Sequence, residues 1–189
     1  MKEQILDYFE SLYKYIPMAV YEGLLSVLCL GVVVIFACNG LKRGWKKIIG
    51  LILIEYVFVI FCSTVIFRTA ADGNGHNFRP FWSYEAIQDG RSELLVENIM
   101  NVVVFIPVGI LLGFMVNGAR CTVMKELLIV LIVGMGISLS IEAMQYFFHR
   151  GFAETDDVMH NTLGCILGAL MVKGSRFMVK GCKNLRKVE

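Results

Sequence analysis

Polar side chains recur at helical spacing inside segments that are otherwise apolar. Glu97 and Asn101 are four residues apart, and Glu142 is followed by Gln145 at i+3 and His149 at i+7. Side chains at these spacings share one face of a helix. An ionisable group at the centre of a membrane-spanning helix costs roughly 2.5 kcal/mol or more, so each of these acids needs a partner or a function.

A third polar face follows later in the chain. Asp157, Asn161, Gly164 and Gly168 stand at i, i+4, i+7 and i+11. Glycines four residues apart allow two helices to approach closely, so polar side chains on neighbouring helices can meet. Two interpretations stay open: the acids and amides hydrogen-bond one another as packing contacts, or they line a polar pocket that opens outward. The number of acids favours the pocket.

Small residues also mark the segment that carries Glu97 and Asn101. Pro107 interrupts its backbone hydrogen-bond ladder and predicts a kink. Gly109 and Gly113 repeat the four-residue glycine spacing. Either glycine pair is suited to close helix packing, and the same pairs could form the contact of a homodimer.

The elements that must position these residues are membrane helices. The chain has 189 residues, of which 57% are hydrophobic and 18% charged, and its net charge is +2. This composition excludes an ordinary soluble domain, a disordered chain and a nucleic-acid-binding module. Four segments are long enough to cross a bilayer and a fifth is shorter: residues 17–38, 48–67, 99–117, 127–148 and 158–172. We therefore expect an all-α integral membrane protein, a single domain (17–189) of about five transmembrane helices.

Basic residues indicate the orientation of this bundle. Most of the 18 basic residues fall between the first two spans, in the 118–126 turn and in the tail 173–189. Cytoplasmic loops carry such an excess, which predicts an N-terminus outside and a cytoplasmic C-terminus. Residues 1–16 are acidic with apolar positions at helical period, which indicates an interfacial amphipathic helix on the outer surface.

An aromatic loop between the second and third spans is the other unusual region. Arg79 and Phe81 lie there in the run HNFRPFWSYE. One interpretation is an aromatic belt that anchors the loop on lipid head groups. The alternative is a lid over the pocket, in which Arg79 or Arg68 binds a phosphate or carboxylate of a lipid ligand.

At these residues the sequence resembles the VanZ-like family of bacterial membrane proteins. Four stretches carry the resemblance within residues 68–172: NFRPF from Asn77, NVVVFIPVG from Asn101, EAMQ from Glu142, and DDVMHNTLG from Asp156 with Gly168. The first is similar to the family's Asn-Leu-Ile-Pro-Phe loop. Glu154 departs from the family pattern, because it stands one position later than the family's acidic residue after Arg150.

The resemblance implies a multi-pass protein of the bacterial cell membrane, in some members linked to resistance to teicoplanin-type lipoglycopeptides. Its motifs coincide with the polar faces derived above. The residues expected to bind are Arg68, Arg79, Phe81, Glu97, Asn101, Glu142, Gln145, Arg150, Asp156, Asp157 and Asn161.

Three kinds of function remain open at this point. The first is a non-enzymatic protein that binds a lipid-linked cell-wall precursor, another lipid-linked envelope component or the lipoglycopeptide itself. The second is an intramembrane enzyme acting on a lipid head group, with Glu142 or Asp157 as acid or base. The third is an assembly partner of cell-wall machinery. We expect no cofactor. A divalent metal could be held by Asp156, Asp157 and Glu97, with His149 or His160. The histidine spacing matches no zinc signature, however, so we expect no metal.

Overall fold

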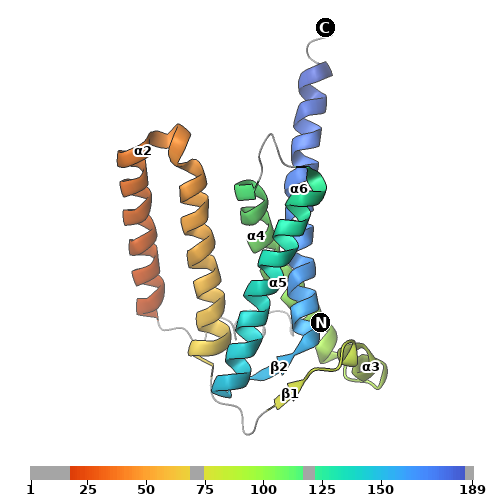
Figure 1. Cartoon of the computed structure of the whole chain (residues 1–189). Helices are drawn as coiled ribbons and strands as arrows, with labels where there is room; N and C mark the ends of the chain where they lie inside the picture. Colours follow the sequence, from red (N-terminus) through yellow and green to blue (C-terminus); the bar gives the residue numbers. More distant parts are fainter. Residues whose placement is uncertain (1–17, 69–74, 117–121, 186–189) are drawn as a thin grey trace.

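A computed structural model describes residues 18–68, 75–116 and 122–185, and the helices dominate it (Figure 1). The elements in chain order are α2 (Met18–Phe61), a π-helical segment η1 (Cys62–Ile66), β1 (Gly75–Asn77), α3 (Trp82–Gln88), α4 (Glu93–Val116), α5 (Val123–Phe148), β2 (Phe152–Glu154) and α6 (Thr155–Leu185). The interfacial helix expected for residues 1–16 lies outside the described residues.

Three helical segments of the described residues are long and apolar enough to cross a membrane. They are Gly44–Ile66, Glu93–Val116 and Val123–Phe148. Large apolar side chains such as Leu128, Ile132 and Phe147 are exposed along the third, as a helix facing lipid requires. The expected all-α membrane protein is confirmed at this level. The expected count of five spans is not supported, because residues 17–38 and 158–172 are not among the three segments.

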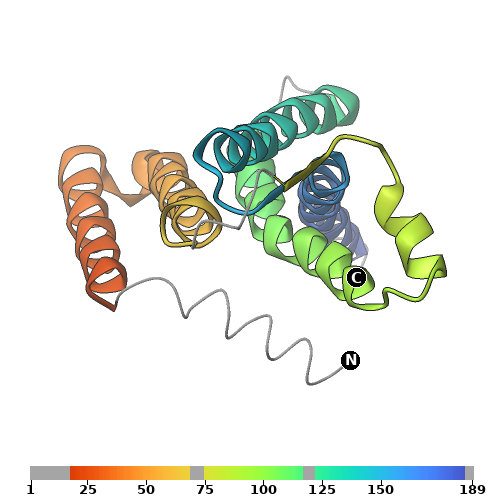
Figure 2. The ribbon, with the colours of Figure 1, turned by 90° about the horizontal axis from the view of Figure 1, so that it is seen from below.

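The first two expected spans belong to one element, α2. Its helical hydrogen bonding continues from Met18 to Phe61. Figure 1 shows that this element folds back on itself, and Figure 2 shows both arms standing beside the cluster formed by α4, α5 and α6. The segment suited to spanning the membrane begins at Gly44, in the second arm.

The fifth apolar segment does not form a short helix as expected. Residues 158–172 lie inside α6, which has 31 residues and continues into the tail that was expected to follow the span. At about 1.5 Å per residue the helix is roughly 46 Å long. Its apolar stretch is short because polar residues occupy both ends, and the first turn contains Asp156 and Asp157.

Glycines set the close packing of α4 on α6. A Cβ atom at any of three of them would overlap the backbone of the other helix: at Gly109 that of Cys165, at Gly164 that of Val102, and at Gly168 that of Ile106. Gly113 lies against Ala169 in the same interface. The glycine faces therefore pack within the chain, and a homodimer would have to use another surface.

Pro107 lies inside α4 and leaves the carbonyl of Val103 without its usual helical donor. The neighbouring carbonyl of Val104 accepts a hydrogen bond of 2.9 Å from the hydroxyl of Tyr56 on α2. This bond ties α2 to the central helices next to a core that includes Phe105 and Val108.

Two short strands were not expected in an all-α protein. β1 and β2 pair in parallel, with Gly75 opposite Phe152 and Asn77 opposite Glu154. The pair joins the segment after α2 to the connection between α5 and α6, close to the start of α3 (Figure 1). Strands of three residues are too short to show the alternation of polar and apolar residues by which a strand is recognised.

Candidate functional site

A cavity of about 170 Å³, here called the polar cavity, lies where α4, α5 and α6 meet η1 and β2. Seven of the residues expected from the sequence line it: Arg68, Glu97, Asn101, Glu142, Gln145, Asp157 and Asn161. Six of them come from the three helices, and Arg68 is the second residue after η1. The helix faces inferred from residue spacing thus converge on one space.

Glu142 and Gln145 form the α5 wall of the polar cavity and are both buried. One carboxylate oxygen of Glu142 accepts a hydrogen bond of 2.9 Å from the backbone N–H of Glu154. The side-chain amide of Gln145 donates to the carbonyl of Thr64 at 3.2 Å. These contacts fix α5 against β2 and η1, so they hold the cavity open between the elements.

Asp157 and Asn161 form the α6 wall. The amide of Asn101 on α4 donates to Asp157 at 2.7 Å, and the amide of Asn161 donates to Ser138 on α5 at 2.9 Å. Each bond crosses from one helix to another. Some of the polar residues therefore make packing contacts between helices, and the same residues line the cavity.

Arg68 and Glu97 lie at the mouth of the polar cavity, where both are exposed. The guanidinium of Arg68 lies against Gly151, whose φ of 123° belongs to the left-handed region that favours glycine. A side chain at this glycine would meet the guanidinium. The Arg150 guanidinium donates to the Arg68 carbonyl at 2.7 Å, so Arg150 supports the mouth without lining the cavity.

Outside α4, α5 and α6, the sequence reasoning missed four residues that line the polar cavity with polar or aromatic groups. Ser63 and Thr64 belong to η1, and Phe152 and Glu154 belong to β2. A π-helical turn has no sequence signal that would have placed Ser63 and Thr64 there, although such turns are frequent at functional sites. Glu154 did carry a signal, because it stood out as the departure from the family pattern.

Glu154 lies outside the membrane-spanning segments and links the cavity to α3. Its carboxylate accepts a hydrogen bond of 2.8 Å from the indole N–H of Trp82. Burial is the largest cause that raises the pKa of Glu154 from its ordinary value of 4.5 to about 8. The negative charge of Asp157 contributes in the same direction, whereas the bond from Trp82 opposes it.

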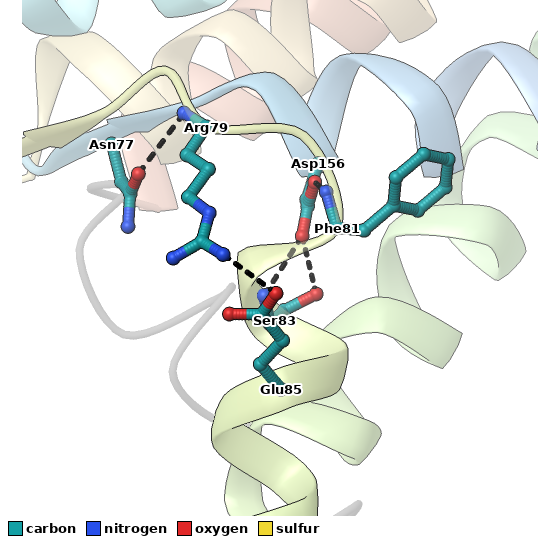
Figure 3. Close-up of polar contacts among 6 residues, drawn as sticks. All are labelled: Asn77, Arg79, Phe81, Ser83, Glu85 and Asp156. Atoms are coloured by element: carbon teal, nitrogen blue, oxygen red, sulfur yellow. Dashed lines mark hydrogen bonds and ion pairs between the residues drawn. The ribbon is translucent and has the colours of Figure 1, made fainter.

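Asp156 does not line the cavity, although it was expected in the binding set. It is fully buried and faces the start of α3, as Figure 3 shows. Its two oxygens accept hydrogen bonds from the backbone N–H of Phe81 at 2.6 Å, from the backbone N–H of Ser83 at 2.9 Å and from the Ser83 hydroxyl at 2.6 Å. Adjacent residues of a helix point in different directions, so Asp157 faces the cavity and Asp156 anchors α3.

Arg79 and Phe81 also lie away from the polar cavity. The guanidinium of Arg79 pairs with Glu85 at 2.8 Å on the surface, and Figure 3 shows the two side chains reaching toward each other. Phe81 is exposed and has a left-handed backbone with a φ of 63°. No residue of the segment 75–92 lines the cavity, so the structure does not support a lid.

Two of the residues considered as metal ligands, Asp156 and His160, have other partners. Asp156 binds the start of α3, and a ring nitrogen of His160 lies 2.8 Å from the Tyr84 hydroxyl. In the part of the chain that the structure describes, no three His, Cys, Asp or Glu side chains are grouped as metal binding requires.

The fold and the site define a helical membrane protein with an acid-rich polar cavity between three packed helices. The family comparison gives the same class a name: the VanZ/LLP1 family model matches residues 47–178. The chain therefore belongs to the VanZ/LLP1 family, which confirms the resemblance drawn from its motifs. The match includes η1, which the sequence motifs did not reach. No curated protein and no solved structure matches the chain.

Proposed function

We propose that this VanZ-like protein binds the head group of a lipid-linked cell-envelope component in the polar cavity and thereby contributes to resistance to teicoplanin-type antibiotics. The observation that carries the proposal is the cavity itself, because Glu142, Gln145, Asp157 and Asn161 converge on open space inside a helical membrane protein. Groups placed in this way are costly unless they bind a ligand or water.

The size of the cavity favours a head group over a whole antibiotic. Sites that enclose drug-sized molecules typically occupy about 300–1,000 Å³, whereas the polar cavity has about 170 Å³. A small polar group attached to a lipid fits this volume, and a lipoglycopeptide does not. Resistance would then arise because the protein engages an envelope lipid, not because it sequesters the drug.

The proposed topology places the cavity at the outer face of the bacterial cell membrane. It keeps five spans, with the two arms of α2 and with α6 added to α4 and α5, and it has the N-terminus outside and the C-terminus in the cytoplasm. The supporting observation is that β1, β2 and α3 lie at the opposite end of the molecule from the end of α6 (Figure 1). A lipid held in the outer leaflet could then enter the cavity laterally.

Removal of the charge of Glu142 tests this function. The full chain is expressed in a teicoplanin-susceptible bacterium, and the minimal inhibitory concentration and the lipids that co-purify with the protein are measured. We expect the wild type to raise the inhibitory concentration and retain a lipid, and Glu142→Gln to lose both. Glu93→Gln is the matched control, because Glu93 is exposed on α4 and does not line the cavity. Undiminished resistance and lipid retention in Glu142→Gln would contradict the proposal.

A second candidate is an enzyme acting on a lipid head group, with Glu142 or Asp157 as acid or base. It is favoured by Glu154, whose pKa of about 8 permits proton exchange near neutral pH beside Glu142. The purified protein is incubated with labelled envelope lipids, with and without a chelator. A new labelled product that disappears in both Glu142→Gln and Asp157→Asn would establish the enzyme, and unchanged lipid would leave the binding function.

A further inference from the structure

An apolar groove lies directly beside the polar cavity. It has a volume of about 310 Å³ and runs between α5, Phe78 just after β1, the end of β2 and the start of α6. Its walls include Phe78, Tyr146 and Phe147, and the rings of Phe78 and Tyr146 are 5.8 Å apart between centroids. Because α5 is one of the segments suited to crossing the membrane and Phe147 is exposed, we expect the groove to be open to the hydrocarbon region.

The groove and the polar cavity meet at two carboxyl groups. Glu142 and Glu154 line both spaces. A molecule that extends across this boundary would have a polar end beside the acids and an apolar end among aromatic and aliphatic side chains. This arrangement matches an amphiphile, and it does not match a ligand that is polar throughout.

The charged side chains that line the polar cavity determine whether the polar end of the ligand is an anion or a cation. Among the described residues, the cavity is lined by four carboxyl-bearing side chains, Glu97, Glu142, Glu154 and Asp157, and by a single guanidinium, that of Arg68. Glu154 retains a proton near neutral pH because its pKa is about 8. Any of the other three carboxyl groups that is ionised would repel an anionic group and attract a cation. The other two arginines that were expected to bind anions lie outside the cavity.

The hydrogen-bond acceptors of the cavity also favour a ligand that carries donor groups. The side-chain carbonyl oxygens of Gln145 and Asn161 have no donor, and both residues are more than nine-tenths buried. Their amide nitrogens already donate, to Thr64 and Ser138. A buried acceptor without a donor is costly, so these two oxygens favour a ligand, or water, that supplies N–H or O–H groups. An ammonium group provides three donors and a positive charge.

We propose that the ligand is an aminolipid, whose primary ammonium group occupies the polar cavity and whose hydrocarbon chain lies in the apolar groove. This inference rests on the proposed lipid-binding function and specifies the chemistry of its ligand. The ammonium group donates to Glu142 and to the unpartnered oxygens of Gln145 and Asn161. The chain leaves past Glu142 and Glu154 toward the bilayer.

The test measures lipid binding to the purified full chain by native mass spectrometry and by the shift in the thermal midpoint. The probes are phosphatidylethanolamine, phosphatidylglycerol and N-acetylated phosphatidylethanolamine with identical acyl chains, and free ethanolamine. We expect phosphatidylethanolamine to bind at least about tenfold more tightly than the other two lipids, as the loss of one charge-assisted hydrogen bond implies. Free ethanolamine should bind more weakly than the aminolipid because it lacks the chain.

Two variants test separately how the polar end and the apolar end of the ligand are bound. Glu142→Gln should weaken aminolipid binding about tenfold and reduce the preference over phosphatidylglycerol. Ala143→Trp fills the groove and should weaken the aminolipid while free ethanolamine binds as before. Met124→Trp is the matched control, because Met124 is exposed at the far end of α5. Thermal midpoints measured without lipid verify that each variant folds.

The outcomes distinguish the inference from the function on which it rests. Equal binding of phosphatidylglycerol and phosphatidylethanolamine would overturn the ammonium assignment and leave lipid binding intact. Binding of free ethanolamine as tight as that of the aminolipid would overturn the assignment of the groove. Failure of every lipid to bind saturably to the wild-type protein would overturn the proposed function together with the inference.

Discussion

Glu154 connects the polar cavity to α3. Its backbone N–H donates to Glu142 on α5, and its carboxylate accepts from Trp82 on α3. The acids that act on it come from the helices around the site: Glu97 on α4, and Asp156 and Asp157 on α6. A carboxyl surrounded in this way retains a proton near neutral pH, because burial and the neighbouring negative charges disfavour its ionised form.

Glu154 should therefore make the stability of the protein depend on pH. Its pKa in the folded protein is about 8, against an ordinary value of 4.5, so ionisation is harder in the folded state than in the unfolded chain. The free energy of unfolding should fall as pH rises from about 4.5 to about 8. Thermal midpoints of the purified protein between pH 4 and pH 9 measure this dependence.

The variant Glu154→Gln assigns that pH dependence. Glutamine has no ionisable proton, so the fall in thermal midpoint should become shallower than in the wild type, while Glu93→Gln should leave the slope unchanged. A slope that is identical in the wild type and in Glu154→Gln would show that other groups are responsible.

Residue types and spacing were enough to predict which side chains of the helices would meet. Glu142 with Gln145, Asp157 with Asn161, and Glu97 with Asn101 all line one cavity. The spacing rule could not separate Asp156 from Asp157, because adjacent acids look alike in sequence and differ only in the direction that the helix gives them. Arg79 was misplaced for a similar reason: its charge was visible, and its partner Glu85 was not considered.

At the scale of elements, the contact between α4 and α6 positions most of the site. The amide nitrogen of Asn101 lies 2.7 Å from a carboxylate oxygen of Asp157. This contact is possible because the backbones of the two helices approach closely at Gly109, Gly164 and Gly168. The glycine spacing predicted a close helix contact from the sequence. It did not decide between a contact within the chain and one in a dimer, since both bury the same face.

The other elements show where the sequence signal ends. The length of the apolar segments indicated α4 and α5, although the expected spans 99–117 and 127–148 begin six and four residues after the starts of these helices at Glu93 and Val123. The pairing of β1 with β2 depends on residues 75 and 152 meeting in space, and three-residue strands carry no local pattern. The length of α6 was underestimated because hydropathy marks its apolar middle and not its polar ends.

Substitution of a glycine in this interface should damage the site at a distance. Gly168→Ala places a methyl group against the backbone of Ile106, and overpacking of this kind costs about 1–3 kcal/mol. The thermal midpoint should fall, and ligand binding should fall with it as Asn101 and Asp157 separate. Gly174→Ala is the matched control on the same helix, because a Cβ atom there meets nothing within 4 Å. Equal midpoints for the two variants would contradict the packing role of Gly168.

At the scale of the whole molecule, the two ends differ in charge and in structure. One end carries β1, β2, α3 and the acids of the polar cavity. At the other end, Lys46 of α2 donates to the carbonyl of Met115 on α4, and Lys173 of α6 pairs with Glu126 of α5. Basic residues from separate segments of the sequence thus lie at one end of the molecule. The sequence predicts this only after the membrane spans have been assigned.

This asymmetry predicts the orientation in the membrane. Lysine and arginine are enriched on the cytoplasmic side, so the end with Lys46 and Lys173 should face the cytoplasm and the cavity should face outward. Single cysteines are introduced into a cysteine-free background at Ser92, between α3 and α4, and at Lys125, near the start of α5; both positions are exposed. A membrane-impermeant thiol reagent is then applied to intact cells and to permeabilised cells.

Ser92→Cys should react in intact cells, because it lies at the cavity end, and Lys125→Cys should react only after permeabilisation. The reverse pattern would show that the cavity faces the cytoplasm, and it would contradict the proposal that the ligand comes from the outer leaflet. An outward cavity would link two separate properties of the chain, its charge asymmetry and the position of the site. The basic end would set the orientation of the protein in the membrane, and that orientation would decide which lipids can reach Glu142.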